Sequence, residues 1–188
     1  MLQGVNGYTQ SQPKLVGTGA SGNARQGQGT AVSGDGLTAC VGGSYDSNTI
    51  GAVWFYTRAD AGTVTWLQQG SKIVPSDNTG SASFGVSCSL SFDGNIAVVG
   101  GPSDNSGIGA TWIITRDGSG VWAQQSAKRV GTGYTGTSIY QGRSISLASI
   151  AIDVYVTGGW ADNSHAGIVS WIILMHLLLM FIFISRHN

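Results

Sequence analysis

The feature that most constrains the fold of this chain is a tandem repeat. Three related runs begin at Gly43, Gly101 and Gly159, which sets the period at 58 residues. The runs read GSYDSNTIGAVW, GPSDNSGIGATW and GWADNSHAGIVSW. Further matches keep the same order, such as Thr57-Arg58 with Thr115-Arg116. A recurrence of this kind predicts similar structural units, each packed against its neighbours.

The middle copy divides into four strand-like segments. Residues 84–91 alternate apolar and small polar positions, and residues 95–100 are almost continuously apolar. Residues 110–115 are rich in β-branched and aromatic types, and a poorer fourth segment runs from residue 121 to about 130. Four short antiparallel strands in a repeated unit are typical of a β-propeller blade. A β-solenoid, the alternative, has a much shorter repeat.

The predicted architecture is therefore all-β. It comprises tandem four-stranded antiparallel blades of a β-propeller, about three of them, incomplete or open, followed by an apolar C-terminal segment. The predicted boundaries are a lead-in at 1–11, repeats over 12–171 and an apolar tail at 172–188. Within the repeats the copies are 12–27 (partial), 28–83, 84–139 and 140–171 (degenerate).

Several runs of the repeats resemble FG-GAP-type repeats, the blades of integrin-like β-propellers. They are QGQGTAVSGDGLTACVGG, FGVSCSLSFDGNIAVVGG and GATWIITR. Phe84-Gly85 stands where that family has Phe-Gly, and Gly100-Gly101-Pro102 resembles its Gly-Ala-Pro with glycine in place of alanine. The resemblance implies a noncatalytic binding or adhesion role and a calcium ion in a blade loop.

The loops that match the family's calcium loops carry few acidic groups. Calcium takes six to eight oxygen ligands, whereas each loop offers one carboxylate, one amide and one or two hydroxyls. Any calcium site is therefore expected to be weak. Alternatively, the Asp and Asn side chains cap the turns by bonding their own backbone. The candidate ligands are Asp46, Asn48, Asp104, Asn105, Asp162 and Asn163.

Composition argues against nucleic-acid binding and against catalysis. The net charge is zero and no basic run is present, so the electrostatic footprint of a nucleic-acid-binding protein is missing. All nine acidic residues are Asp, and only Asp153 lies outside a turn or loop that the repeat explains. Neither a nucleophile elbow nor a metal-ligand cluster occurs in the sequence. No catalytic residue and no enzyme activity is predicted.

The cysteines and most of the tryptophans are predicted to lie in the core. Cys40 and Cys88 each fall in an apolar strand pattern. Trp54, Trp112 and Trp171 share one repeat position, and Trp66 and Trp122 share another, which favours packing between units. Trp160 breaks the pattern, because it falls in the loop that follows a strand. It is the candidate ligand-binding residue.

The end of the chain leaves three interpretations open. Residues 168–184 contain only Ser170 and His176 as polar residues, which is the shortest length that spans a membrane. The segment is predicted to be a C-terminal anchor, the product of a shifted reading frame, or a buried strand or helix. The first residues, MLQGVNGYTQ, do not have the pattern of a signal peptide.

The sequence thus predicts a noncatalytic repeat module for binding or adhesion at a surface or outside the cell, with a protein or glycan as ligand. The alternative is a structural protein that self-assembles, or recruits further blades, through open sheet edges. A fragment of a carbohydrate-active enzyme is a third alternative.

Overall fold

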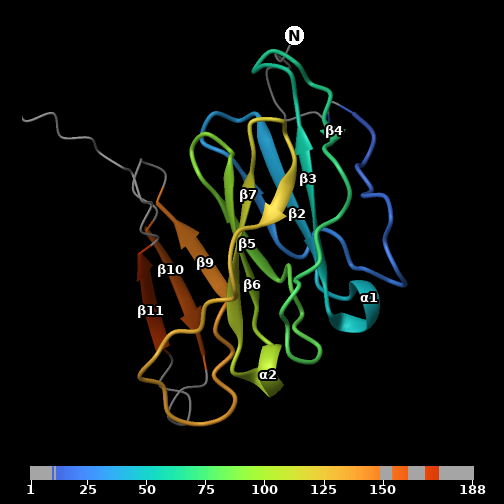
Figure 1. Ribbon diagram of the computed structural model, residues 1–188. Coiled ribbons are helices and arrows are strands. Elements are labelled where there is room, and N and C mark those ends of the chain that lie inside the picture. Colours follow the sequence, from blue (N-terminus) through green and yellow to red (C-terminus); the bar gives the residue numbers. More distant parts are fainter. Residues whose placement is uncertain (1–9, 11, 149–153, 161–167, 174–188) are drawn as a thin grey trace, which may run out of the picture.

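The protein is all-β, built from three antiparallel sheets that follow one another along the chain (Figure 1). The computed structural model describes residues 10, 12–148, 154–160 and 168–173, the last six by their backbone only. Two sheets have four strands, and the third has three within the described residues. This confirms the predicted all-β class and the four-stranded unit of the first two copies. The described sheets do not close into a ring (Figure 1).

Each sheet takes its strands in sequence order, as hairpin connections require. The first sheet contains β1 (Thr30–Val32), β2 (Thr38–Gly43), β3 (Ala52–Thr57) and β4 (Leu67–Gln68). The second contains β5 (Ser87–Leu90), β6 (Ile96–Gly101), β7 (Ala110–Arg116) and β8 (Trp122–Gln124). The third contains β9 (Ser144–Leu147), β10 (Val154–Gly159) and β11 (Ile168–Ile173).

The repeat is preserved down to the pairing of individual residues. Trp54 pairs with Val41 and Trp112 with Val99 on the hairpin between the second and third strands, and the equivalent pair in the third sheet is Thr157 with Ser170. Trp171 lies one position further along, opposite Val156. Trp171 therefore does not share the repeat position of Trp54 and Trp112, and the prediction that the three tryptophans are equivalent is wrong.

Two single-turn helices, α1 (Asp46–Thr49) and α2 (Asp104–Gly107), occupy the loops between the second and third strands. Both are distorted. Ser47 and Asn48 in α1, and Asn105 and Ser106 in α2, have positive φ angles of 48° to 58°. Both helices lie at the same end of the molecule in Figure 1.

The sheets pack face to face, with β5 in contact with both β1 and β9. Between the first and second sheets lies the largest core cluster, in which Phe55 stacks on Trp122 at a ring-centroid distance of 3.7 Å. Cys40 and Cys88 are buried, unpaired thiols in this cluster, which confirms their predicted place in the core. Gly42 allows the close approach of the sheets, because a Cβ there would lie 2.0 Å from the carbonyl oxygen of Gly85.

The predicted membrane segment is corrected in its first part. Ile168–Ile173 forms β11, which pairs with β10 along its whole length, so these residues continue the repeat as its third strand. Residues 174–184 lie outside the described part of the chain. Among the described residues, no helix has the length and apolar character needed to cross a membrane.

Candidate functional site

The loop carboxylates predicted as calcium ligands are buried in the first two sheets. Asp46 and Asp104 are both completely shielded from solvent. The Oδ1 atom of Asp46 accepts a hydrogen bond from the backbone N–H of Ser21 at 2.6 Å, and that of Asp104 accepts one from Thr79 at 2.6 Å. Each carboxylate therefore ties the start of its helical turn to the segment that enters its sheet.

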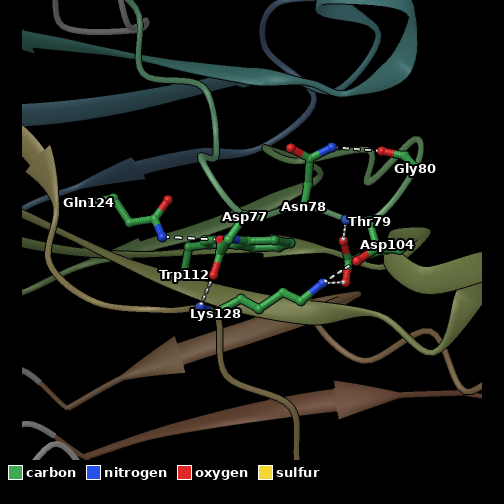
Figure 2. Close-up of polar contacts among 8 residues, drawn as sticks. All are labelled: Asp77, Asn78, Thr79, Gly80, Asp104, Trp112, Gln124 and Lys128. Atoms are coloured by element: carbon green, nitrogen blue, oxygen red, sulfur yellow. Dashed lines mark hydrogen bonds and ion pairs between the residues drawn. The ribbon is translucent and has the colours of Figure 1, made fainter.

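A lysine neutralises each of these carboxylates. Lys72 forms an ion pair with Oδ2 of Asp46. Figure 2 shows the corresponding pair of the second sheet, in which Lys128 lies 2.5 Å from Oδ2 of Asp104. Burial alone would raise the pKa of Asp46. The hydrogen bonds from Lys72, Ser21 and Ser47, with the charge of Lys72, outweigh burial and hold this pKa below its ordinary value.

The ion pairs bear directly on the calcium prediction. A cation at Asp46 or Asp104 would have to displace a lysine ammonium from the same oxygen atom. Asn48 and Asn105 lie in the same helical turns and are exposed. Among the described residues, no group of three or more His, Cys, Asp or Glu side chains is arranged to hold a metal ion. Asp162 and Asn163 lie outside the described residues, and calcium binding stays a prediction.

Asp77 holds together the second sheet in a way that sequence reasoning missed (Figure 2). Its Oδ1 accepts hydrogen bonds from Nε1 of Trp112 at 2.7 Å and Nε2 of Gln124 at 3.1 Å. Its Oδ2 accepts the backbone N–H of Lys128 at 2.7 Å. Burial would raise the pKa of Asp77, but these hydrogen bonds and the nearby Lys128 charge keep it lowered. In the first sheet, Nε1 of Trp54 instead donates to the carbonyl oxygen of Thr18 at 2.7 Å.

The remaining described carboxylates lie in turns, as the sequence predicted, and they cap those turns. Each accepts the backbone N–H of a residue two positions further along, at 2.8 to 3.1 Å. They belong to Asp35, Asp60, Asp93 and Asp117. Every described carboxylate is thus held by hydrogen bonds from groups of its own repeat or of the adjoining segment.

One contact beside the end of the second strand differs in every sheet; its second residue in the third sheet, Trp160, stands one repeat position before Tyr45 and Ser103. Arg25 lies 3.7 Å from the ring centre of Tyr45 in the first. In the second, the Ser83 hydroxyl donates to Ser103 at 3.0 Å. In the third, Tyr140 stacks on Trp160, with 5.5 Å between ring centroids. We call these three contacts the variable pairs.

The variable pairs lie at the same end of the molecule, and the first residue of each pair has the same backbone conformation. Arg25, Ser83 and Tyr140 all have φ between 53° and 58°, the left-handed region that few residues adopt. Their partners follow β2, β6 and β10, whose ends lie at the end of the molecule that carries α1 and α2 (Figure 1). Tyr45 is 39 % exposed and Trp160 53 % exposed, so the predicted exposure of Trp160 is confirmed.

Comparison with known proteins adds no family name. No family model matches the chain, and no curated protein matches it at a significant level.

Proposed function

We propose that this protein is a noncatalytic, propeller-like repeat module that binds a ligand through the end of its sheets bearing the variable pairs. The observation that carries the proposal is the contrast between a constant frame and these variable contacts. The FG-GAP-type resemblance supports treating each sheet as a blade and points to a surface or extracellular setting for binding or adhesion.

The contacts that recur from one sheet to the next stabilise both four-stranded sheets. The Asp–Lys ion pair recurs at Asp46 and Asp104, and the cation–π contact recurs between Arg58 and Trp66 and between Arg116 and Trp122. In contrast, the variable pairs change from cation–π to hydroxyl pair to aromatic stack. Chemistry that varies on a fixed frame is typical of a binding surface, because loops on a rigid scaffold tolerate change.

The carboxylates support a noncatalytic role. Acid–base hydrolysis of a glycoside needs a carboxyl group whose pKa is raised enough to donate a proton. The pKa values of Asp60, Asp93 and Asp117 are lowered, as are those of Asp46 and Asp77. A lowered pKa is the opposite of what such a proton donor needs, which disfavours the carbohydrate-active enzyme.

Exposed aromatic rings indicate the ligand chemistry. Tyr and Trp offer flat apolar faces with a polar edge, which suit a sugar ring or an apolar protein side chain. The ligand is therefore expected to be a glycan or a protein, as the sequence analysis predicted. If calcium contributes, it binds weakly at the loops of α1 and α2, where millimolar calcium would raise the melting temperature.

The test is a glycan array and a panel of extracellular-matrix proteins, probed with the intact chain and with three variants. Tyr45→Ser and Trp160→Ser remove the exposed rings, and each should lower binding to the same ligand at least tenfold. Val121→Ser is the matched control. It removes an equally exposed apolar side chain, 59 % exposed, at the opposite end of the second sheet. Equal binding by all three variants would refute this surface.

A self-assembling structural role is the second candidate. It is favoured by the three-stranded third sheet, whose strand β11 pairs only with β10 among the described residues.

A further inference from the structure

The third strands of the first two sheets are completed by a segment that lies beyond the named strands. Val53 of β3 exchanges two backbone hydrogen bonds with Ile73, both 2.9 Å long. Thr111 of β7 exchanges two with Arg129, at 2.9 and 2.7 Å. These bridges lie next to the Asp–Lys ion pairs, since Lys72 and Lys128 immediately precede Ile73 and Arg129. Bridge and ion pair together close the outer edge of each sheet.

The chain contains a third copy of this closing segment. Residues 14–17 read KLVG, at the repeat position of KIVP (72–75) and KRVG (128–131). The three lysines of the whole chain, Lys14, Lys72 and Lys128, are the first residues of these segments. We call residues 14–17 the Lys14 segment. Leu15 stands where Ile73 and Arg129 stand.

Within the Lys14 segment, Gly17 is hydrogen-bonded to a side chain of the first repeat, whereas the residues before it are not. The backbone N–H and C=O of Gly17 both bond the Gln26 side chain, at 2.6 and 2.9 Å, so the segment enters the first sheet as the others enter theirs. No hydrogen bond or ion pair joins Lys14, Leu15 or Val16 to any other described residue. Leu15 is 41 % exposed and Val16 62 % exposed. Among the described residues, no third strand pairs with this half of the segment.

The third sheet has no closing segment on β11 within the described residues. In β11, Val169 pairs with Gly158, as Val53 pairs with Gly42 and Thr111 with Gly100. Val169 is therefore the position that a closing segment would bridge. Within the described residues, no strand pairs with the outer edge of β11. Residues 172–188 contain no Trp, Gln or Lys, the residue types that mark the fourth strand and its exit in the other copies.

Within one copy, these two described parts do not meet. The Lys14 segment enters the first sheet, and β5 of the second sheet lies between β1 and β9 of the first and third. The two surfaces lie on opposite sides of the molecule (Figure 1). A second copy of the chain presents the missing partner without any change in its fold. An exposed strand edge is a ready template for such pairing.

We propose that two copies of this chain assemble head to tail, with the Lys14 segment of each copy forming the closing segment on β11 of the other. Leu15 of one copy exchanges backbone hydrogen bonds with Val169 of the second, in the register of Ile73 with Val53. Two copies supply six sheets, a number within the usual range of four to eight for a closed propeller. The assembly depends on strand register and is independent of any ligand at the variable pairs.

Disulfide trapping tests the register. Residues that exchange both backbone hydrogen bonds in an antiparallel pair have Cα atoms about 5.5 Å apart, within the range for a disulfide. Chains carrying Leu15→Cys, mixed with chains carrying Val169→Cys, should form a disulfide-linked heterodimer under mild oxidation. The native thiols, Cys40 and Cys88, are buried and do not compete. Val64→Cys mixed with Val169→Cys is the control, because Val64 is as exposed as Leu15, at 43 %.

Sedimentation of the intact chain gives the second measurement. The wild type should sediment as two copies, and Leu15→Pro should weaken association at least tenfold, because proline removes the N–H that bonds β11. Leu15→Thr keeps that N–H and should retain the dimer. A wild type that stays monomeric at high concentration would overturn the proposal. So would equal dimerisation of the proline and threonine variants, or equal trapping of Leu15→Cys and Val64→Cys.

Discussion

The middle copy differs from its two neighbours at one repeat position, which holds an apolar side chain in the middle copy and a hydrogen-bonding side chain in the other two. In the outer copies, a buried or half-buried glutamine, Gln26 or Gln141, bonds both backbone groups of a glycine, Gly17 or Gly131. In the middle copy the glutamine position holds Phe84, which packs edge-on against Trp112 at 5.3 Å. The backbone at Phe84 and Gln141 is nevertheless alike, each forming a parallel bridge to a glycine, Gly51 or Gly109.

The residue at the glycine position explains the difference. In the middle copy that position is Pro75, which is buried and has no N–H to donate. A glutamine beside it could not form the paired hydrogen bonds that Gly17 and Gly131 permit. A buried amide without a partner costs about 1–3 kcal/mol, whereas a phenyl ring needs no partner. The two positions therefore change together, glycine with glutamine and proline with phenylalanine.

Breaking the middle copy should have the largest effect. Phe84→Gln removes a fully buried ring and places an amide beside Pro75. We expect a loss of about 4 kcal/mol in the free energy of unfolding, measured by urea denaturation. The double variant Pro75→Gly, Phe84→Gln restores the donor and should recover about 1–2 kcal/mol relative to the sum of the single variants. Strict additivity would contradict the pairing.

The ion pairs provide the second test, at a position where the first two sheets do not differ. Lys128→Met and Lys72→Met each leave a fully buried carboxylate without its cation. Both should destabilise the fold by about 3 kcal/mol, since breaking a buried pair strands a charge. Lys14→Met is the control, because Lys14 is exposed and makes no ion pair with a described residue. In monomeric protein its effect should stay below about 0.5 kcal/mol.

Replacing the glutamines should have the third largest effect on the free energy of unfolding. Gln141→Met keeps the size of the side chain but leaves two backbone groups of Gly131 without partners. It should cost about 2 kcal/mol because Gln141 is only 1 % exposed. Gln26→Met should cost about 1 kcal/mol, since water reaches the half-buried Gln26. Gln125→Met, at an exposed site, should be neutral. Equal costs for all three would show that the glycine contacts contribute nothing.

The smallest effect is expected in acid. Because the folded pKa of Asp77 is lowered, its contribution to stability is present above the unfolded value of about 3.9 and is lost as the pH falls through the folded pKa. The first sheet uses the Thr18 carbonyl, which does not titrate. Asp77→Asn should therefore lose less stability than the wild type between pH 7 and pH 3, measured by urea midpoints. Parallel curves for the two proteins would contradict this role.

The strands and turns were predictable from the sequence because their signals are local. The predicted segments at 95–100 and 110–115 correspond to β6 and β7, within one residue at each end. The Asp-Gly turn at Asp93 was predicted for the same reason, since its carboxylate bonds Asn95 two residues along. Of the three interpretations of the apolar segment, the anchor does not apply to its first part, because Ile168–Ile173 is a strand. Apolar composition alone does not distinguish a third strand from a membrane span.

The candidate site was only partly predictable. The exposure of Trp160 followed from its loop position. The repeat correctly placed Trp54, Trp112 and Trp122 in the core, whereas Trp66 is half-buried and the side chain of Trp171 lies outside the described part of the structure. The partners of the buried carboxylates did not follow, although the recurrence of Lys72 and Lys128 at one repeat position was a usable signal. Lys72 lies 26 residues from Asp46, and Lys128 lies 24 from Asp104, too far for a local pattern to reveal the contact.

The sequence by itself determined the unit of this protein: the repeat, its four strands, its turns and the apolar positions that alternate on each face. Those properties depend on neighbouring residues and on backbone geometry. Only the tertiary structure decided which polar groups meet, such as Asp46 with Lys72, Gln141 with Gly131 and Asp77 with Trp112. The physical reason is that packing removes water from these groups, and each must then find its hydrogen-bond partner on a segment that folding brings alongside.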